Sequence, residues 1–367
     1  MKHRNVMLML LSTGAAIVLS GCSTNRAILQ SPPSTAAGAV VMEAGAADNE
    51  NPYAAGATAA GALKAAMGEV EPHLVLMADS FDDEALKKKA IRGVASVFPA
   101  DIVCGGASYG GFTQAGSLDS DAVALLGIGG DGITVTAVLE CDMGAAGLDM
   151  ETQEDQVAAA LSEAGTRLAG NVPNADSGAL LILIADAHSP KSQFLLDGVQ
   201  SVLGKRFPIT GGSVNKNAGQ SYVYYRGGMY ADSAVAILLS GDLKIAQSGR
   251  QAKSNDAVVT TAKEGSAAAV KALGVKPIAA IAFDCGGRKG KLNNLADELK
   301  AIQSSVGKEG TLLGGYKAGE FGPAEAPDPE TGVCSGRGRH ARCTLYGRWA
   351  WTVPEATTCL ARTTIST

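Results

Sequence analysis

HLVLMADS (residues 73–80) is an apolar run that ends on an acid, and a helical pattern separates it from DIVCGGAS (101–108). Two further copies of this block follow in the chain. They read ALLILIADA (179–187) with PITGGSV (208–214), and IAAIAFDC (278–285) with TLLGGYK (311–317). Each copy predicts a strand, a helix and a second strand that ends on Gly-Gly. Repetition on this scale predicts an internally duplicated architecture.

The helical stretches between these strands carry apolar residues three and four positions apart, which places them on one helix face. A further helix is expected before each opening strand, near 59–67, 157–168 and 258–273. In the first two copies, apolar runs then flank glycine turns at 129–132 and 241–242, which predict antiparallel hairpins. The sequence therefore predicts an α/β fold (α+β mixed), with internally repeated mixed β-sheets and flanking helices.

The repeat places matching loops at matching strand ends, and α/β proteins build their pockets at the carboxyl ends of strands. We therefore expect the equivalent loops to surround a common hollow. The strand-end acids are candidates to contact a polar ligand, and the alternative is that each caps the helix that follows it. Glycine pairs let the backbone approach either a ligand or another strand closely. The candidate residues of these two kinds are Asp79, Asp186, Asp284, Gly106 and Gly212.

The first 22 residues resemble a bacterial lipoprotein signal peptide. A basic start precedes an apolar stretch that is short for a membrane span, and LSGC at 19–22 resembles the lipobox. The resemblance implies lipidation of Cys22, and Ser23 after it implies the periplasmic side of the outer membrane; an ordinary secretory peptide is the alternative. Residues 23–56 are rich in Ala, Ser, Pro and Gly and predict a flexible tether.

Composition limits the classes of partner. The net charge is −5 and aromatic residues make up 5% of the chain, so neither a basic surface nor a stacking platform for nucleic acid is expected. Export permits disulfides, and Cys334 and Cys343 are the favoured pair because they flank one short basic segment. Four histidines without zinc-like spacing predict no metal site, and no cofactor is expected.

CGGR at 285–288 and GYKAGEFGP at 315–323 resemble two motifs of the FIST domain, a bacterial sensory module with an N-terminal and a C-terminal part. On this resemblance, 57–250 is the N-terminal part with two repeats, 251–353 is an abbreviated C-terminal part and 354–367 is a tail. The resemblance implies a protein that binds amino acids or similar metabolites and takes part in signalling. Since no output domain is attached, a separate signalling protein is the expected partner.

Arg288 and Glu320, one in each motif, are the main ligand candidates. An arginine fork suits a carboxylate and a glutamate suits an ammonium, although the two side chains are alternatively paired with each other. Tyr316 offers a wall or a hydroxyl donor. The sequence thus predicts ligand binding without turnover. Three alternatives remain: a cysteine hydrolase that uses Cys285 with His188 as its base, a haem-binding nitric oxide sensor, and a scaffold lipoprotein without a ligand.

Overall fold

The computed structural model describes residues 27–34, 38–216 and 221–323, together with the backbone of 346–354. They form three six-stranded mixed sheets. In the order of their strands, the first sheet is β2 (Val41–Asp48), β7 (Ala122–Gly129), β3 (Pro72–Asp79), β4 (Val103–Ala107), β11 (Val223–Tyr225) and β12 (Gly228–Tyr230). The second sheet is β1 (Leu29–Gln30), β8 (Ile133–Glu140), β13 (Ala234–Gly241), β9 (Gly178–Ala185), β10 (Ile209–Ser213) and β17 (Glu320–Phe321). The third sheet is β14 (Leu243–Gln251), β18 (Tyr346–Pro354), β15 (Ala279–Cys285), β16 (Thr311–Lys317), β5 (Gly111–Thr113) and β6 (Gly116–Leu118).

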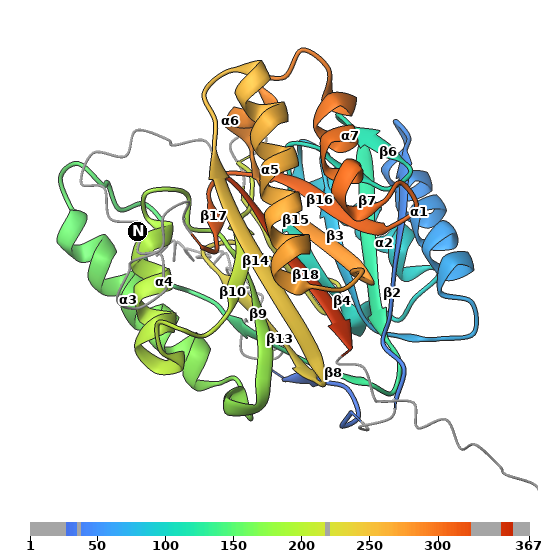
Figure 1. The fold of residues 1–367 in the computed structure, drawn as a ribbon. Coiled ribbons are helices and arrows are strands. Elements are labelled where there is room, and N and C mark those ends of the chain that lie inside the picture. Colours follow the sequence, from blue (N-terminus) through green and yellow to red (C-terminus); the bar gives the residue numbers. More distant parts are fainter. Residues whose placement is uncertain (1–26, 35–37, 217–220, 324–345, 355–367) are drawn as a thin grey trace, which may run out of the picture.

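A pair of helices packs on each sheet. Figure 1 shows one pair at each side of the molecule and the third in front. The pairs are α1 (Pro52–Met67) with α2 (Glu84–Ala95), α3 (Glu154–Gly170) with α4 (Ser192–Leu203), and α5 (Asn255–Leu273) with α7 (Leu295–Val306); a short α6 (Gly286–Lys289) follows β15. Glycines let the first two pairs pack closely: a Cβ on Gly56 would lie 2.2 Å from the Ala90 carbonyl oxygen, and one on Gly198 would lie 2.1 Å from that of Ser162.

The inner faces of the three sheets meet in one apolar core. Leu76 of β3, Ile184 of β9 and Ile281 of β15 belong to this central cluster, while the outer faces form three separate clusters with the helix pairs. The three parallel strand pairs, β3–β4, β9–β10 and β15–β16, occupy equivalent places in their sheets. The prediction of internally repeated mixed sheets with flanking helices is therefore confirmed.

The chain passes from one sheet to another after each Gly-Gly strand. β5 follows β4 but pairs with β16, β11 follows β10 but pairs with β4, and β17 follows β16 but pairs with β10. Each repeat thus completes the edge of a sheet whose centre belongs to a different repeat.

The predicted antiparallel hairpins are wrong. β7 lies between β3 and β2 in the first sheet, whereas β8 lies between β1 and β13 in the second; likewise, β13 and β14 lie in different sheets. The glycine turns therefore connect neighbouring sheets. The physical reason is that β7 is buried along its whole length and β8 along nearly all of it, and a lone hairpin would expose one face of each strand.

Part of the predicted tether is also wrong. Residues 41–48 are strand β2, which forms eight residue pairs with β7 and places Met42 and Ala44 in the central core. Helix α1 begins at Pro52, capped by the Asn51 side chain, and so includes 52–56. Small residues at 44–47 fit because α1 packs closely there: a Cβ on Gly45 would lie 2.5 Å from the Ala59 carbonyl oxygen.

The predicted boundary between 250 and 251 falls inside β14, which pairs with β18 of the third sheet. Because strands are exchanged in this way, the three repeats form one interleaved structure. Cys22, Cys334 and Cys343 lie outside the described residues, as do 354–367 except for Pro354. Within the described part, no helix is long and apolar enough to cross a membrane.

Candidate functional site

Three predicted ligand residues lie in a closed cluster inside the third repeat. Arg288 Nε lies 2.6 Å from Asp284 Oδ1, and Arg288 Nη2 donates to Glu298 Oε1 at 2.8 Å. The Tyr316 hydroxyl donates to Glu298 Oε2 at 2.9 Å, and all four side chains are fully buried. The guanidinium therefore meets two internal carboxylates, and this cluster joins β15, α6, α7 and β16 instead of facing a ligand.

Asp79 is buried in the first repeat. Its Oδ2 accepts a hydrogen bond from the Tyr224 hydroxyl and its Oδ1 accepts one from the Phe81 backbone N–H at 3.1 Å. Burial raises the pKa of the Asp79 carboxyl, against the opposing effects of Tyr224 and of the Lys87 charge. Asp79 therefore ties the end of β3 to β11, a role closer to the capping alternative than to ligand contact.

Lys317, which the sequence did not single out, lies at the junction of the three repeats. Its Nζ donates to the carbonyl oxygens of Gly106 at 3.2 Å and Ala107 at 3.1 Å, and burial lowers its pKa to about 8. The predicted glycines serve packing here. A Cβ on Gly212 would lie 2.7 Å from Lys317 Cγ, and one on Gly106 would lie 2.3 Å from Val214 Cγ1.

The expected common hollow is almost filled. The cavity between the inner strands, lined by Leu76, Ile184 and Ile281 and reached by Lys317, has a volume of about 10 Å³. That is room for about one water molecule. The apolar side chains of the three inner faces occupy the rest, so a metabolite does not fit at the centre of this structure.

Asp186 is the one predicted acid that lines a large cavity. It follows β9 directly, and the cavity beside it has a volume of about 510 Å³. We call this space the Asp186 cavity. The charged and polar residues in its wall are Asp186, His188, Ser189, Lys191, Lys216, Ser221, Tyr222 and Asp232.

Hydrogen bonds fix the cavity wall on the side of Asp232. Asp232 Oδ2 accepts from the Gly144 N–H at 2.9 Å and its Oδ1 from the Ala145 N–H at 3.3 Å. The Asp232 N–H in turn donates to Asp186 Oδ2 at 2.8 Å, which leaves Asp186 Oδ1 on the side of His188. Lys191 Nζ donates to the Leu148 carbonyl at 2.8 Å. The loop of residues 144–148 is thus held near its start by Asp232 and at its end by Lys191, and both residues line the cavity.

His188 lies in the turn between β9 and α4. Ser213 Oγ donates to the Ala187 carbonyl at 2.7 Å, and the Ser189 N–H donates to the Ala318 carbonyl at 3.1 Å, so β10 and the turn between β16 and β17 hold the two sides of this turn. The Ser189–Pro190 bond is cis, and α4 begins at Ser192.

The imidazole of His188 contacts two cavity residues through one nitrogen. Its Nε2 lies 3.3 Å from Ser221 Oγ and 3.9 Å from Asp186 Oδ1. Burial lowers the pKa of His188, while Asp186 and a hydrogen bond to the Val214 backbone oppose that shift. The ring is therefore mainly neutral at pH 7 and serves as a hydrogen-bonding group, not as a fixed cation.

Glu320 does not line the Asp186 cavity, and lies half-buried on β17, opposite Gly212 of β10. Arg288 makes its ion pairs with Asp284 and Glu298. Cys285 is buried at the end of β15 and is likewise absent from the wall of the cavity.

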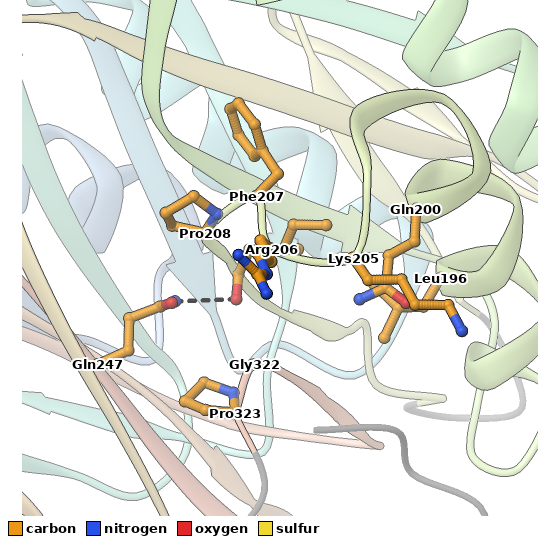
Figure 2. Close-up of a pocket in the computed structure, with 10 residues that line it drawn as sticks. Leu196, Gln200, Lys205, Arg206, Phe207, Pro208, Gln247, Gly322 and Pro323 are labelled. Carbon is orange, nitrogen blue, oxygen red and sulfur yellow. Dashed lines mark hydrogen bonds between the residues drawn. The ribbon is translucent and has the colours of Figure 1, made fainter. Parts of the chain in front are cut away.

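Two other cavities are weaker candidates. The one in Figure 2, beside Lys205, Arg206 and Gln247, has a volume of about 100 Å³, and Gln247 there donates to the Ile209 carbonyl at 2.9 Å. A cavity of about 530 Å³ adjoins Ser177 at the amino end of β9. The Asp186 cavity combines a comparable volume with both signs of charge, and it lies at the carboxyl end of β9, where α/β folds place their ligands.

Metal binding finds no support in the described residues, where no three His, Cys, Asp or Glu side chains come together as a metal site. Sequence reasoning missed Lys191, Lys216 and Ser221. For Lys216 the sequence offers one indication of a site role, because this residue comes shortly after the Gly-Gly strand of the second repeat. For Ser221 the sequence offers no indication, since its approach to His188 depends on the return of the chain from β10 to β11.

Comparison with known proteins gives a family match. The model of the FIST N domain matches residues 73–270, which is more than half of the chain. No curated protein sequence matches.

Solved structures with a similar arrangement include two cyanuric acid hydrolases, one of them from A. caulinodans. Both are 11% identical to this chain; matches cover 86% and 87% of it and 100% of each hydrolase, with TM-scores of 0.41 and 0.43. T. maritima PurL is 10% identical, with 88% of this chain and 74% of PurL covered and a TM-score of 0.27. Similarity at this level assigns neither an activity nor a ligand.

Proposed function

The chain belongs to the FIST family, and from this premise we propose that it is a sensory protein that binds a small zwitterionic metabolite, such as an amino acid, in the Asp186 cavity. The observation that carries the proposal is the charge distribution around this cavity. Two lysines, Lys191 and Lys216, and two acids, Asp186 and Asp232, line a space of about 510 Å³. A molecule with one carboxylate and one ammonium group matches both signs.

The two charges of the ligand have different partners. Asp232 is committed to backbone amides and Lys191 to a backbone carbonyl, so Asp186 and the exposed Lys216 are the groups best placed to meet a ligand. The Lys216 ammonium attracts a carboxylate, and Asp186 Oδ1 accepts from an ammonium. The neutral His188 and Ser221 add further hydrogen-bonding groups to the cavity wall.

The amino-acid proposal is tested by binding. The purified chain is titrated with the twenty amino acids while thermal stability and heat of binding are measured. We expect at least one to stabilise the protein, and we expect Lys216→Gln and Asp186→Asn each to weaken its binding tenfold or more, since each removes one charge contact.

Exposed residues of the same type provide matched controls, because neither lines the cavity: Lys276→Gln and Asp242→Asn should bind as the unchanged chain does. If no amino acid binds, or if binding survives in both cavity variants, the proposal fails.

The proposal includes a lipid anchor on Cys22 and a separate signalling protein as the output. The support for the anchor is the lipobox-like LSGC at 19–22, and the support for the partner is the match to the FIST family, which suggests a sensory role. Cells that express the chain are fed a palmitate analogue with a clickable tag. The unchanged chain should be labelled and fractionate with the outer membrane, and Cys22→Ser should be unlabelled; a labelled Cys22→Ser chain would contradict the anchor.

A further inference from the structure

We infer that Ser221 and His188 form a nucleophile–base pair that cleaves an acyl bond, an ester or an amide, in a molecule bound in the Asp186 cavity. The inference rests on the proposed cavity as the ligand site, but not on an amino acid as the ligand. It departs from the expectation of binding without turnover. It also places the nucleophile at a serine in the cavity wall, not at the buried Cys285.

The first support is the geometry of the pair. Ser221 Oγ lies 3.3 Å from His188 Nε2, within the looser range seen for such pairs in unliganded enzymes. The neutral ring carries its proton on one nitrogen only. With that proton on Nδ1, the Nε2 lone pair is directed at Ser221 Oγ and accepts the serine proton.

The second support is the charge around the pair. Asp186 Oδ1, 3.9 Å from Nε2, stabilises the imidazolium that forms when His188 takes a proton. Lys216 lies in the wall of the same cavity and supplies positive charge for an oxyanion. Lys191 also lines the cavity, and both lysines oppose permanent protonation of the ring.

The reaction balances with water as the only co-reactant. Ser221 Oγ bonds to the acyl carbon while its proton moves to His188 Nε2, and the bond to the leaving group breaks as that group takes the proton from Nε2. Water then attacks the acyl-serine, and its proton passes to Nε2. The carboxylic acid leaves as Ser221 Oγ recovers its proton.

A fluorophosphonate probe tests the nucleophile directly. The purified chain is treated with the probe, and the modified residue is identified by intact mass and peptide mapping. We expect labelling at Ser221, none in Ser221→Ala, and labelling at least a hundredfold slower in His188→Gln, since the base is lost. Ser304→Ala is the matched control, because Ser304 is an exposed serine on α7 that does not line the cavity, and it should be labelled as the unchanged chain is.

The pH profile separates a base from a structural histidine. The labelling rate should fall as pH drops through the lowered pKa of His188 and level off above it, and His188→Gln should show no such step. Release of nitrophenol from p-nitrophenyl acetate should follow the same pattern across the variants.

Absence of Ser221 labelling in the unchanged chain would overturn the inference, as would equal rates in His188→Gln. The outcome is independent of the amino-acid titration. If amino acids bind and Ser221 is inert, the proposed function stands alone. If Ser221 reacts and no amino acid binds, the cavity has a different ligand.

Discussion

Arg288 and Lys216 are both cations next to strand-end loops, but only Lys216 is exposed. Arg288 makes ion pairs with Asp284 and Glu298 inside the third repeat. Its removal leaves two buried carboxylates without their counter-ion. The two residues therefore have separable roles, one in stability and one in the proposed binding.

We predict that Arg288→Ala lowers the free energy of unfolding by about 3–5 kcal/mol, because it breaks a buried ion pair. Urea unfolding measures the change. Arg92→Ala, an exposed arginine on α2, is the control and should stay within about 0.5 kcal/mol of the unchanged chain. A stable Arg288→Ala protein that had lost only ligand affinity would restore Arg288 as a ligand residue.

Lys317 makes a second residue-scale prediction, on pH. Burial lowers its pKa from 10.5 to about 8, so between these values the unfolded chain holds a proton that the folded chain has released. Stability must therefore rise with pH across this window. From pH 7 to pH 10, the unchanged chain should gain roughly 2–3 kcal/mol relative to Lys317→Met.

Urea midpoints at the two pH values check this difference, with Lys276→Met as the exposed control. Parallel pH curves for the unchanged chain and Lys317→Met would show that Lys317 titrates normally and that its ammonium is not desolvated.

The sequence predicted Asp186 as a site residue from the repeat, and the structure places it in a cavity of about 510 Å³ that is lined by groups of both charge signs. The repeat also selected Asp79 and Asp284, and the family motif selected Arg288; all three are buried. A motif gives the residue type and its place at a strand end, but exposure depends on which other strand covers that end. In this fold, the covering strand comes from a different repeat.

At the element scale, a glycine in a Gly-Gly strand and a glycine in a helix differ in whether a side chain fits. Gly211 has a φ of 151°, and a Cβ there would lie 1.8 Å from the Leu183 carbonyl oxygen of β9. Gly61, in α1, would meet nothing within 4 Å. The pairing of β9 with β10 therefore requires glycine at position 211, whereas helix α1 does not require glycine at position 61.

We predict that Gly211→Ala costs about 3 kcal/mol or more, because it combines backbone strain with a clash against a neighbouring strand. Gly61→Ala should instead stabilise the protein by about 0.5–1 kcal/mol, since alanine favours the helix. Thermal unfolding of both variants gives the comparison. A harmless Gly211→Ala would mean that β9 and β10 do not pair in the described register.

The elements themselves were largely predictable, because apolar periodicity marks strands and helices. Their partners were not. The runs around the glycine turns at 129–132 and 241–242 were correctly predicted as strands and incorrectly as hairpins. Periodicity reports which faces are buried, and β7 and β8 are buried among strands from different sheets.

At the scale of the whole molecule, the first described strands belong to the fold. β2 forms one edge of the first sheet and places Met42 in the central core. No other described strand occupies this edge. We predict that a chain beginning at residue 50 is destabilised by at least about 3 kcal/mol relative to one beginning at residue 27, since it loses a buried methionine and the ladders of β1 with β8 and of β2 with β7. Urea unfolding of the two chains measures this loss. Equal stabilities would support the flexible tether that the composition predicted for 41–48.

During translation, the hairpin of β5 and β6 leaves the ribosome long before β16, the strand with which β5 pairs. β4 likewise emerges before its partner β11. Early repeats therefore emerge with unfinished sheet edges. Because these contacts join residues far apart in the chain, closure comes late and slowly, as the loops between them must be ordered first. Until the third repeat arrives, these open sheet edges are exposed to pairing with other chains.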